Sequence, residues 1–309
     1  MILLFTGGGG AGNQAIYRIL RKKYNIYFAD AKHTSFSPDI PRSRCYKTPF
    51  AKETDYTSEV LSLIDKLGVE LVVPGVDEEL VYLKELESVR SDIRVLTPEV
   101  EYIKLMLDKL LAFKKLDALG VDVPWTSTAE SSSKITFPCI VKPRVGRGSR
   151  GFKIIESEEK LDAYCILSKL SRSEILVQEM LVGEEYTVIM SADSSRSLRS
   201  IVPIRVQEKQ GITIRGSTES SNEVLCFCEE LHKKYPASGC YNIQLIVSAQ
   251  GRVRPFEINP RISTTFCLAL AAGVDPVKIY TSNDKFSGLA KFRTGVGLFR
   301  NWDNSFYGL

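Results

Sequence analysis

Hydrophobic and polar positions alternate between two patterns in the first hundred residues. Short apolar runs at residues 2–5, 26–29, 69–73 and 93–96 predict strands. Between these runs, residues 13–23, 57–67 and 78–89 carry apolar positions at helical spacing. Strands that alternate with helices form parallel sheets covered by helices. Residues 1–97 are therefore predicted to form a Rossmann-like domain, which ends at Thr97-Pro98 because proline cannot continue a strand ladder.

The pattern changes after Pro98, where residues 100–119 predict a helix that ends before Gly120 and Pro124. Residues 126–133 are rich in serine and are expected to form a loop. A further helix is predicted at residues 158–170. Strands are predicted at residues 135–143, 151–155, 175–180, 186–191, 200–206, 241–247 and 252–259. The fold class is thus α/β followed by α+β, with a mainly antiparallel second sheet and domains at residues 1–97 and 98–309.

Composition narrows the class of protein only slightly. Lys and Arg number 41 against 37 Asp and Glu, an excess too small to indicate a nucleic-acid or membrane partner. No apolar run approaches the roughly 20 residues of a membrane span, and no export signal precedes the first strand, so the cytoplasm is expected. The seven cysteines lack paired spacing and are expected to be reduced. His33 and His232 lie outside every motif.

Two features of the first domain allow more than one interpretation. Gly7, Gly9 and Gly12 have the G-x-G-x-x-G spacing between a strand and a helix, and Asp30 ends the next strand, which is typical of dinucleotide dehydrogenases. The alternative is a tight turn whose N–H groups face a substrate carboxylate or phosphate. Residues 77 and 78 are both acidic and either cap the following helix or contact substrate.

A second glycine loop, residues 142–151, joins two strands rather than a strand and a helix, which excludes the Walker type. Such a loop can fold over phosphates, with Gly148 supplying a backbone N–H group and Ser149 a hydroxyl. Lys142 precedes the loop on a strand, where a fixed ammonium can meet a nucleotide phosphate.

A third cluster is expected where two neighbouring strands form a hairpin. Glu257 and Asn259 are two positions apart and therefore share one face of a strand. The predicted hairpin brings Gln244 across from Glu257 to within a residue or two, and the oxygens of these three residues can hold Mg²⁺ on a nucleotide. Arg261 follows on the same strand, where a guanidinium can stabilise a transferring phosphoryl group.

These residues resemble the ATP-grasp superfamily, and within it the carbamoyl-phosphate-synthase-like carboxylate–amine ligases. The segment at residues 256–261, FEINPR, and the segment at residues 177–186, VQEMLVGEEY, carry most of the resemblance. The resemblance extends to a closing strand near residues 299–302. It implies a pre-ATP-grasp domain followed by a two-lobed ATP-grasp domain, with a mobile lid at about residues 125–181.

The resemblance also implies roles for single residues. In relatives with these motifs, Glu179 and the backbone of Met180 and Leu181 meet the adenine base, and Glu185 meets the ribose. Lys109 and Lys142 would reach the phosphates beneath the lid loop that holds Gly148 and Ser149. Arg261 would act on the transferring phosphate, and Arg215 would help to hold the carboxylate. Gln244 departs from the acid found in many relatives, which puts a second Mg²⁺ in doubt.

The implied reaction uses ATP with Mg²⁺, or with Mn²⁺, to convert a small carboxylate into an acyl phosphate. An amine or a thiol then attacks the acyl phosphate, and ADP and phosphate leave. A homodimer is the assembly that the family suggests. Two alternatives stay open: a regulatory nucleotide-binding protein without turnover, and the dehydrogenase. Substrate choice is assigned to loops at residues 34–49 and 209–222.

Overall fold

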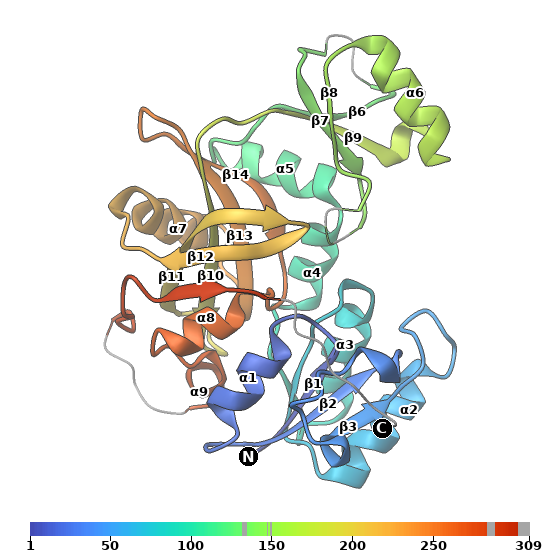
Figure 1. The fold of residues 1–309 in the computed structure, drawn as a ribbon, viewed down its shortest axis with the longest axis vertical. Coiled ribbons are helices and arrows are strands. Elements are labelled where there is room, and N and C mark those ends of the chain that lie inside the picture. The colour runs from blue at the N-terminus through green and yellow to red at the C-terminus, as the bar shows by residue number, and fades with distance from the viewer. Residues whose placement is uncertain (132–134, 147, 149, 283–287, 302–309) are drawn as a thin grey trace.

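The first sheet is parallel and forms the N-terminal part of the chain (Figure 1). The computed structural model describes residues 1–131, 135–146, 148, 150–282 and 288–301. The strand order is β3-β2-β1-β4-β5, with β1 (Ile2–Thr6), β2 (Asn25–Asp30), β3 (Cys45–Lys47), β4 (Leu71–Val73) and β5 (Arg94–Val95). The predicted Rossmann-like arrangement is confirmed. The edge strand β3 was not predicted, because its three residues lie in a mixed polar stretch.

Helices cover both faces of this sheet, because alternate residues of each strand point to opposite sides. The helices from this part of the chain are α1 (Asn13–Leu20), α2 (Tyr56–Leu67) and α3 (Leu80–Val89), and short 3-10 turns lie at His33–Ser35, Arg42–Arg44 and Asp77–Glu79. Leu4 packs with residues of α2 and α3. Leu3 and Phe5 pack on the opposite face with residues of α1 and of two later helices, α8 (Phe266–Ala271) and α9 (Pro276–Thr281).

The second sheet has six strands and is antiparallel, as predicted. Its order is β14-β13-β10-β11-β12-β15, with β10 (Glu184–Ala192), β11 (Leu198–Gln210), β12 (Ile212–Thr218), β13 (Gly239–Val247), β14 (Val253–Asn259) and β15 (Gly297–Phe299). One face packs on α4 (Val100–Leu107), α5 (Lys109–Ala118) and α7 (Asn222–Lys234), and the other on α8 and α9. The closing strand lies at Gly297–Phe299, and residue 302 is outside the described part of the chain.

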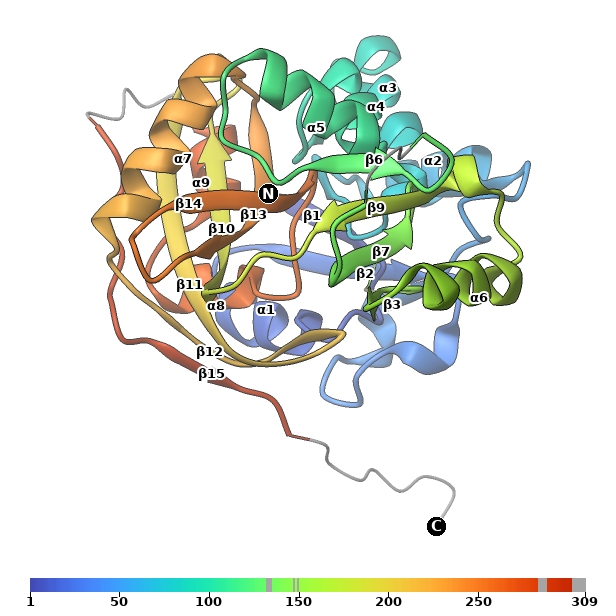
Figure 2. The same ribbon diagram turned by 90° about the horizontal axis from the view of Figure 1, so that it is seen from above.

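A third, smaller sheet lies at the end of the molecule away from the N-terminal sheet (Figure 1), and Figure 2 shows this sheet from above with α6 beside it. Its order is β6-β9-β7-β8, with β6 (Thr126–Thr128), β7 (Cys139–Pro143), β8 (Lys153–Ile155) and β9 (Ile175–Glu179). All of its pairings are antiparallel, and α6 (Glu158–Ser168) packs on one side before a 3-10 turn at Arg172–Glu174. The glycine loop joins β7 to β8, as the sequence predicts.

Three expectations about local structure were wrong. The helix expected at residues 100–119 is two helices, because Asp108 takes an extended backbone conformation (φ −95°, ψ 98°) and caps α5. The stretch expected as a loop at residues 126–133 begins with β6, which pairs with β9; residues 132 and 133 are outside the described residues. The loop expected at residues 209–222 is mostly β12, which pairs with β11.

The hydrophobic core is continuous across Pro98. One cluster of buried side chains includes Leu3 and Phe5 of β1 together with Ile189 of β10 and Phe266 of α8. Within the described residues, no helix is both long and apolar enough to cross a bilayer.

Candidate active site

A cavity of about 460 Å³ lies between the small sheet and the strands β10, β11, β13 and β14 of the large sheet. One part of its wall is apolar and is formed by Ile140, Phe152, Ile154, Ile246 and Phe256. Another part carries charge, from Lys109, Lys142, Arg150, Lys209, Glu179, Glu185 and Glu257. A cavity with these two parts suits a ligand that joins a flat apolar group to a polyanion.

Glu257 lies at the centre of the charged part. Its Oε1 is 3.5 Å from Lys109 Nζ, and its Oε2 accepts a hydrogen bond of 2.8 Å from Gln244 Nε2. Burial alone would raise the pKa of Glu257, but the nearby charges of Lys109, Lys142, Lys209 and Arg261 outweigh it and hold this pKa below its ordinary value. Glu257 is therefore ionised and can act as a metal ligand.

Lys142 is almost completely buried at the base of the glycine loop, with 8% of its surface exposed. Its Nζ donates to Gln178 Oε1 and to the carbonyl of Phe256, both at 3.0 Å. Burial lowers the pKa of Lys142 to about 8, Glu257 opposes this change, and Lys109 and Lys209 add to it. An ammonium held in this way can bind a phosphate without first paying the entropy of being ordered.

The hairpin of β13 and β14 has the predicted register. Gln244 pairs with Glu257, and Asn242 pairs with Asn259. Asn259 Nδ2 donates to Asn242 Oδ1 at 3.2 Å, so the amide next to Glu257 is fixed by its neighbour on β13. Among the described residues, no group of three or more His, Cys, Asp and Glu could hold a metal. A metal here would therefore depend on the single carboxylate of Glu257 with amide oxygens.

The segment at the end of β9 forms the rim of the cavity. Glu179, Met180 and Leu181 all line the cavity, as does Glu185 at the start of β10. Glu179 Oε2 accepts from Arg254 Nη1 at 2.8 Å and from the backbone N–H of Trp125 at 3.2 Å. These contacts fix the start of the connection between the small sheet and the large one.

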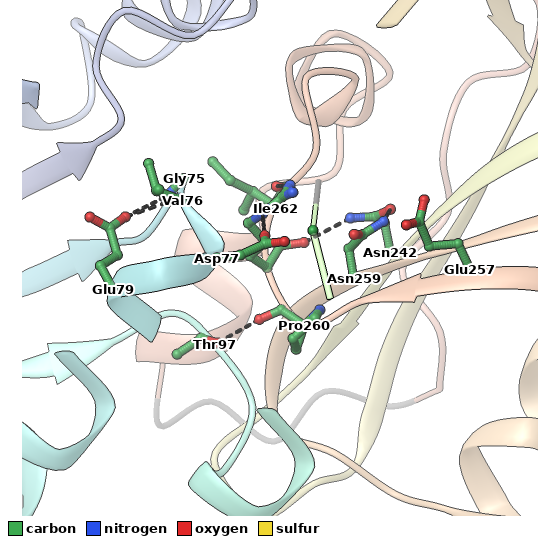
Figure 3. A network of polar contacts seen from close by, with 12 residues as sticks. Gly75, Val76, Asp77, Glu79, Thr97, Asn242, Glu257, Asn259, Pro260 and Ile262 are labelled. Atoms are coloured by element: carbon green, nitrogen blue, oxygen red, sulfur yellow. Dashed lines mark hydrogen bonds and ion pairs between the residues drawn. The ribbon is translucent and has the colours of Figure 1, made fainter. Parts of the chain in front are cut away.

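Arg261 lies beside this cavity rather than in its lining. Its Nε donates to Asp77 Oδ1, and its Nη1 donates to the carbonyl of Ile262 at 3.0 Å. Figure 3 shows Asp77, which lies in the segment after β4, beside Ile262. Of the two interpretations left open for Asp77 and Glu78, the structure does not support capping of α3: the N-cap residue is Glu79, whose side chain accepts from the N–H groups of Gly75 and Val76 instead.

Among the described residues, three other predicted site residues are absent from the cavity lining: Arg215, Gly148 and Asn259. Arg215 stacks on the ring of Phe299 at 4.3 Å and lies 3.6 Å from Glu208, so the described contacts do not bring it to Glu257. Gly148 has a φ of +67° in the turn between Gly146 and Arg150, two residues that do line the cavity. Ser149 is outside the described residues.

The N-terminal glycine loop is filled by the chain itself. The N–H of Gly8 donates to the carbonyl of Ala29 at 2.8 Å, and the N–H of Gly9 donates to Asp30 Oδ2 at 2.9 Å. A Cβ built on Gly9 would be 2.0 Å from Ser35 Oγ, so the segment after β2 packs directly on the loop. These contacts argue against a dinucleotide on this loop, because the N–H groups of Gly8 and Gly9 and the space beside Gly9 are already used.

The residues missed by sequence reasoning include two that contact the proposed metal ligands, Lys209 and Asn242. Lys209 lines the cavity, contacts Glu185 and donates to Gln244 Oε1 at 3.0 Å. Asn242 supports both Asn259 and the carbonyl of Arg261, to which its Nδ2 donates at 2.9 Å. Asn242 could have been found from the hairpin register. Lys209 carried no signal, because it falls in a stretch that was expected to be a loop.

The fold and the cavity together define the class of nucleotide-binding proteins in which a cavity lies between two sheets. The family description "ATP-grasp domain" matches residues 106–265, and the chain belongs to the ATP-grasp family. The predicted membership of the superfamily of carboxylate–amine ligases is confirmed.

Known proteins similar to the chain span several activities. The chain described here is 25% identical over 238 residues to the carbamoyl phosphate synthase large chain of Clostridium beijerinckii. The match covers 71% of this chain and 22% of that protein. The N5-carboxyaminoimidazole synthetase of Staphylococcus aureus complexed with ADP has a TM-score of 0.73 at 14% identity, covering 94% of this chain and 79% of that one. A third similar protein is the biotin carboxylase domain dimer of the Hydrogenobacter thermophilus 2-oxoglutarate carboxylase, in complex with MgADP and bicarbonate. Its TM-score is 0.69 at 16% identity, and the match covers 93% of this chain and 71% of that one.

Proposed function

We propose that the protein is an ATP-dependent ligase that phosphorylates a small carboxylate and passes the resulting acyl phosphate to an amine. In this reaction a carboxylate oxygen attacks the γ-phosphorus of ATP and ADP leaves; the amine then attacks the acyl carbon, loses a proton and displaces phosphate. The observation that carries the proposal is the meeting of Lys109, Lys142 and Glu257 in one cavity with an apolar wall.

The cavity supports a nucleotide orientation in which the base lies against the apolar wall. Glu179 and the backbone of Met180 and Leu181 would meet the base, and Glu185 the ribose. Lys109 and Lys142 would then neutralise phosphate charge, beneath a loop with Gly148 and Ser149. The structures compared above support this use of the fold, because they are complexes with ADP or MgADP.

The donor set fits a single Mg²⁺. Gln244, Glu257 and Asn259 come from adjacent strands in the observed register, and Mg²⁺ on a nucleotide needs only one or two carboxylates besides phosphate oxygens and water. When bound, the metal neutralises phosphate charge. Mn²⁺ has no support among the proteins compared above. Gln244 is neutral, which favours one metal ion over two. Lys209 donates to Gln244 Oε1 and would have to move for this oxygen to bind the metal.

Arg261 is proposed to stabilise the transferring phosphoryl group, and Arg215 to hold the carboxylate. The described contacts support Arg261 better, because its charge contributes to lowering the pKa of Glu257.

The proposed division of the chain is a pre-ATP-grasp domain at residues 1–97 and an ATP-grasp domain at residues 98–309, with a lid at about 125–181. A homodimer and a cytoplasmic location stay predictions. The chain spans 22% of the carbamoyl phosphate synthase large chain of Clostridium beijerinckii and 26% of that of Campylobacter jejuni, so the small-molecule substrates are also part of the proposal.

An assay of ADP release tests the proposal. The purified protein is given Mg-ATP with a panel of small carboxylates, each with and without amines. Release that requires both a carboxylate and an amine is expected, and Glu257→Ala should abolish it. Mg-ATP binding by calorimetry without ADP release for any pair would favour the alternative of a regulatory nucleotide-binding protein. Absence of Mg-ATP binding would contradict both.

A further inference from the structure

The ion pair between Asp77 and Arg261 joins two parts of the chain that are 184 positions apart. Both side chains are largely buried, each with 13% exposure. Asp77 follows β4 at the carboxyl edge of the parallel sheet, which is where open α/β sheets place functional residues. Arg261 follows β14, two positions beyond Asn259. The pair therefore connects the N-terminal sheet directly to the proposed metal-binding strand.

The turn that carries Asp77 is held rigidly by a buried carboxylate. Glu79 is 3% exposed, and its Oε1 accepts from the N–H groups of Gly75 at 3.2 Å and Val76 at 3.0 Å. The hydroxyls of Thr6 and Tyr56 donate to the two oxygens of Glu79, both at 2.5 Å. Figure 3 shows Glu79 turned toward Gly75 and Val76. The position of Asp77 is thus set by the N-terminal sheet before any ligand binds.

The backbone around Arg261 is fixed from the other side. Asn242 Nδ2 donates to the carbonyl of Arg261 at 2.9 Å, and Thr97 Oγ1 donates to the carbonyl of Pro260 at 2.7 Å. Figure 3 shows both contacts converging on the segment after β14. With the backbone held, the direction of the long Arg261 side chain depends on its own contacts. Asp77 supplies the ionic one, at Nε.

We propose that Asp77 is a positioning residue that orients the Arg261 guanidinium for phosphoryl transfer. The inference rests on the proposed function of the site. Asp77 uses Nε, and the carbonyl of Ile262 uses Nη1, so among the described residues Nη2 has no acceptor. That donor is available to a phosphoryl or carboxylate oxygen. Orienting the guanidinium in advance removes the cost of ordering a flexible side chain during the reaction. The N-terminal sheet would in this way complete the active site.

Asp77→Asn tests this role, because it keeps the size of the side chain and removes its charge. With the fastest carboxylate and amine pair, kcat for ADP release should fall by about tenfold, and KM for ATP should stay unchanged. A tenfold fall is the low end of the effect of losing a contact that supports a functional residue. Lys23→Ala is the matched control, since it removes another ion pair between distant parts of the chain, the 3.4 Å contact of Lys23 Nζ with Asp275 Oδ2. This control should leave kcat unchanged.

A double-mutant cycle separates positioning from a general loss of stability. If Asp77 acts through Arg261, adding Asp77→Asn to Arg261→Ala should lower kcat no further. Equal losses in both backgrounds, or a wild-type kcat in Asp77→Asn, would overturn the proposal. Melting temperatures check that each variant is folded.

A second readout needs no substrate. Modification of Arg261 by phenylglyoxal, followed by mass spectrometry, should be several times faster in Asp77→Asn than in the wild type or in Lys23→Ala. An unchanged rate would overturn the positioning role even if the ligase activity is real. Conversely, faster modification in a protein that releases no ADP would leave the role of the pair in orienting Arg261 supported and would count against the proposed function alone.

Discussion

At the scale of single residues, the charge of Glu257 is central to the site. Because its folded-state pKa is lowered, ionised Glu257 contributes stability that is present above the pKa of the unfolded chain, about 4.3, and is lost as pH falls through the folded-state pKa. Glu257→Gln should therefore lower the free energy of unfolding at pH 7 by about 1–3 kcal/mol, since it removes the negative charge that faces Lys109, Lys142 and Lys209.

Urea denaturation at a series of pH values measures this effect. The difference between Glu257→Gln and the wild type should be constant above about pH 5 and should shrink in more acidic solution. A variant more stable than the wild type at pH 7 would show that the cost of burying Glu257 exceeds the attraction of its neighbours.

Lys142 gives a prediction for binding rather than for stability. Its pKa is lowered to about 8 in the ligand-free protein, so Lys142 begins to lose its charge just above neutral pH. A bound phosphate would favour the charged form, and the affinity for Mg-ATP should therefore fall above pH 8, by at most about tenfold for each pH unit. Lys142→Met should bind more weakly at pH 7, and its affinity should change less between pH 7 and pH 9. Calorimetry across this range makes the comparison, and parallel slopes for the two proteins would count against this assignment.

Residues on regular strands could be predicted from the sequence, because a period of two determines which side chains share a face. Glu257 and Gln244 were placed together in this way, and the pairing is observed. Lys209 could not be predicted. Its position depends on the 13-residue strand β11, whose pairing with β12 shifts register between Val206 and Lys209. A bulge of this kind redirects side chains and leaves no pattern in the sequence.

At the scale of helices and strands, the elements with strong local sequence signals were predicted, whereas others were missed. The parallel strands are short apolar runs, and the glycine loop has a distinctive composition. Helices α8 and α9 have only six residues each and are buried, so they show no amphipathic period. The break between α4 and α5 was missed for a different reason: apolar residues continue at helical spacing through Asp108, and only the capping contacts reveal it.

Asp108 supports a prediction about that break. Its Oδ1 accepts from the N–H groups of Leu110 and Leu111, both at 3.1 Å, and its Oδ2 accepts from Arg144 Nη2 at 2.7 Å. Asp108→Ala removes the cap and the ion pair and should lower the free energy of unfolding by about 1–2 kcal/mol. Asp108→Asn keeps a capping oxygen and should lose less. Chemical denaturation measures both variants, and equal losses would show that the Arg144 pair matters more than the cap.

Asp108 also affects the site, because it lies between the helices next to Lys109. The N–H of Lys109 donates to the carbonyl of Arg144 at 3.2 Å, and Lys109 Nζ donates to the carbonyl of Gly146 at 2.5 Å. The start of α5 and the glycine loop are thus tied together. This arrangement explains how a helix from one part of the fold presents an ammonium to a cavity bounded by strands from two sheets.

At the scale of the whole molecule, the parallel and antiparallel sheets share one hydrophobic core. The cluster that contains Leu3 and Phe5 also contains Ile189 and Phe266, so separating residues 1–97 from the rest would expose apolar side chains on both sides. Close backbone contacts support the same conclusion. A Cβ built on Gly12 would be 2.7 Å from the carbonyl oxygen of Thr264, and one on Gly239 would be 2.6 Å from that of Thr97.

The full chain is therefore expected to unfold in a single calorimetric transition that includes the N-terminal sheet. Residues 98–309, expressed alone, should lack fixed tertiary packing. Loss of near-UV circular dichroism with retained far-UV signal would identify such a state. Gly12→Ala offers a milder test, because the added methyl group must push α1 away from Thr264; it should lower the midpoint and keep one transition. Two transitions in the full chain, or native packing in the fragment, would contradict the shared core. If the core is shared, the carboxyl edge that carries Asp77 cannot move independently of the strand that carries Arg261, and the two halves of the proposed site form together when the chain folds.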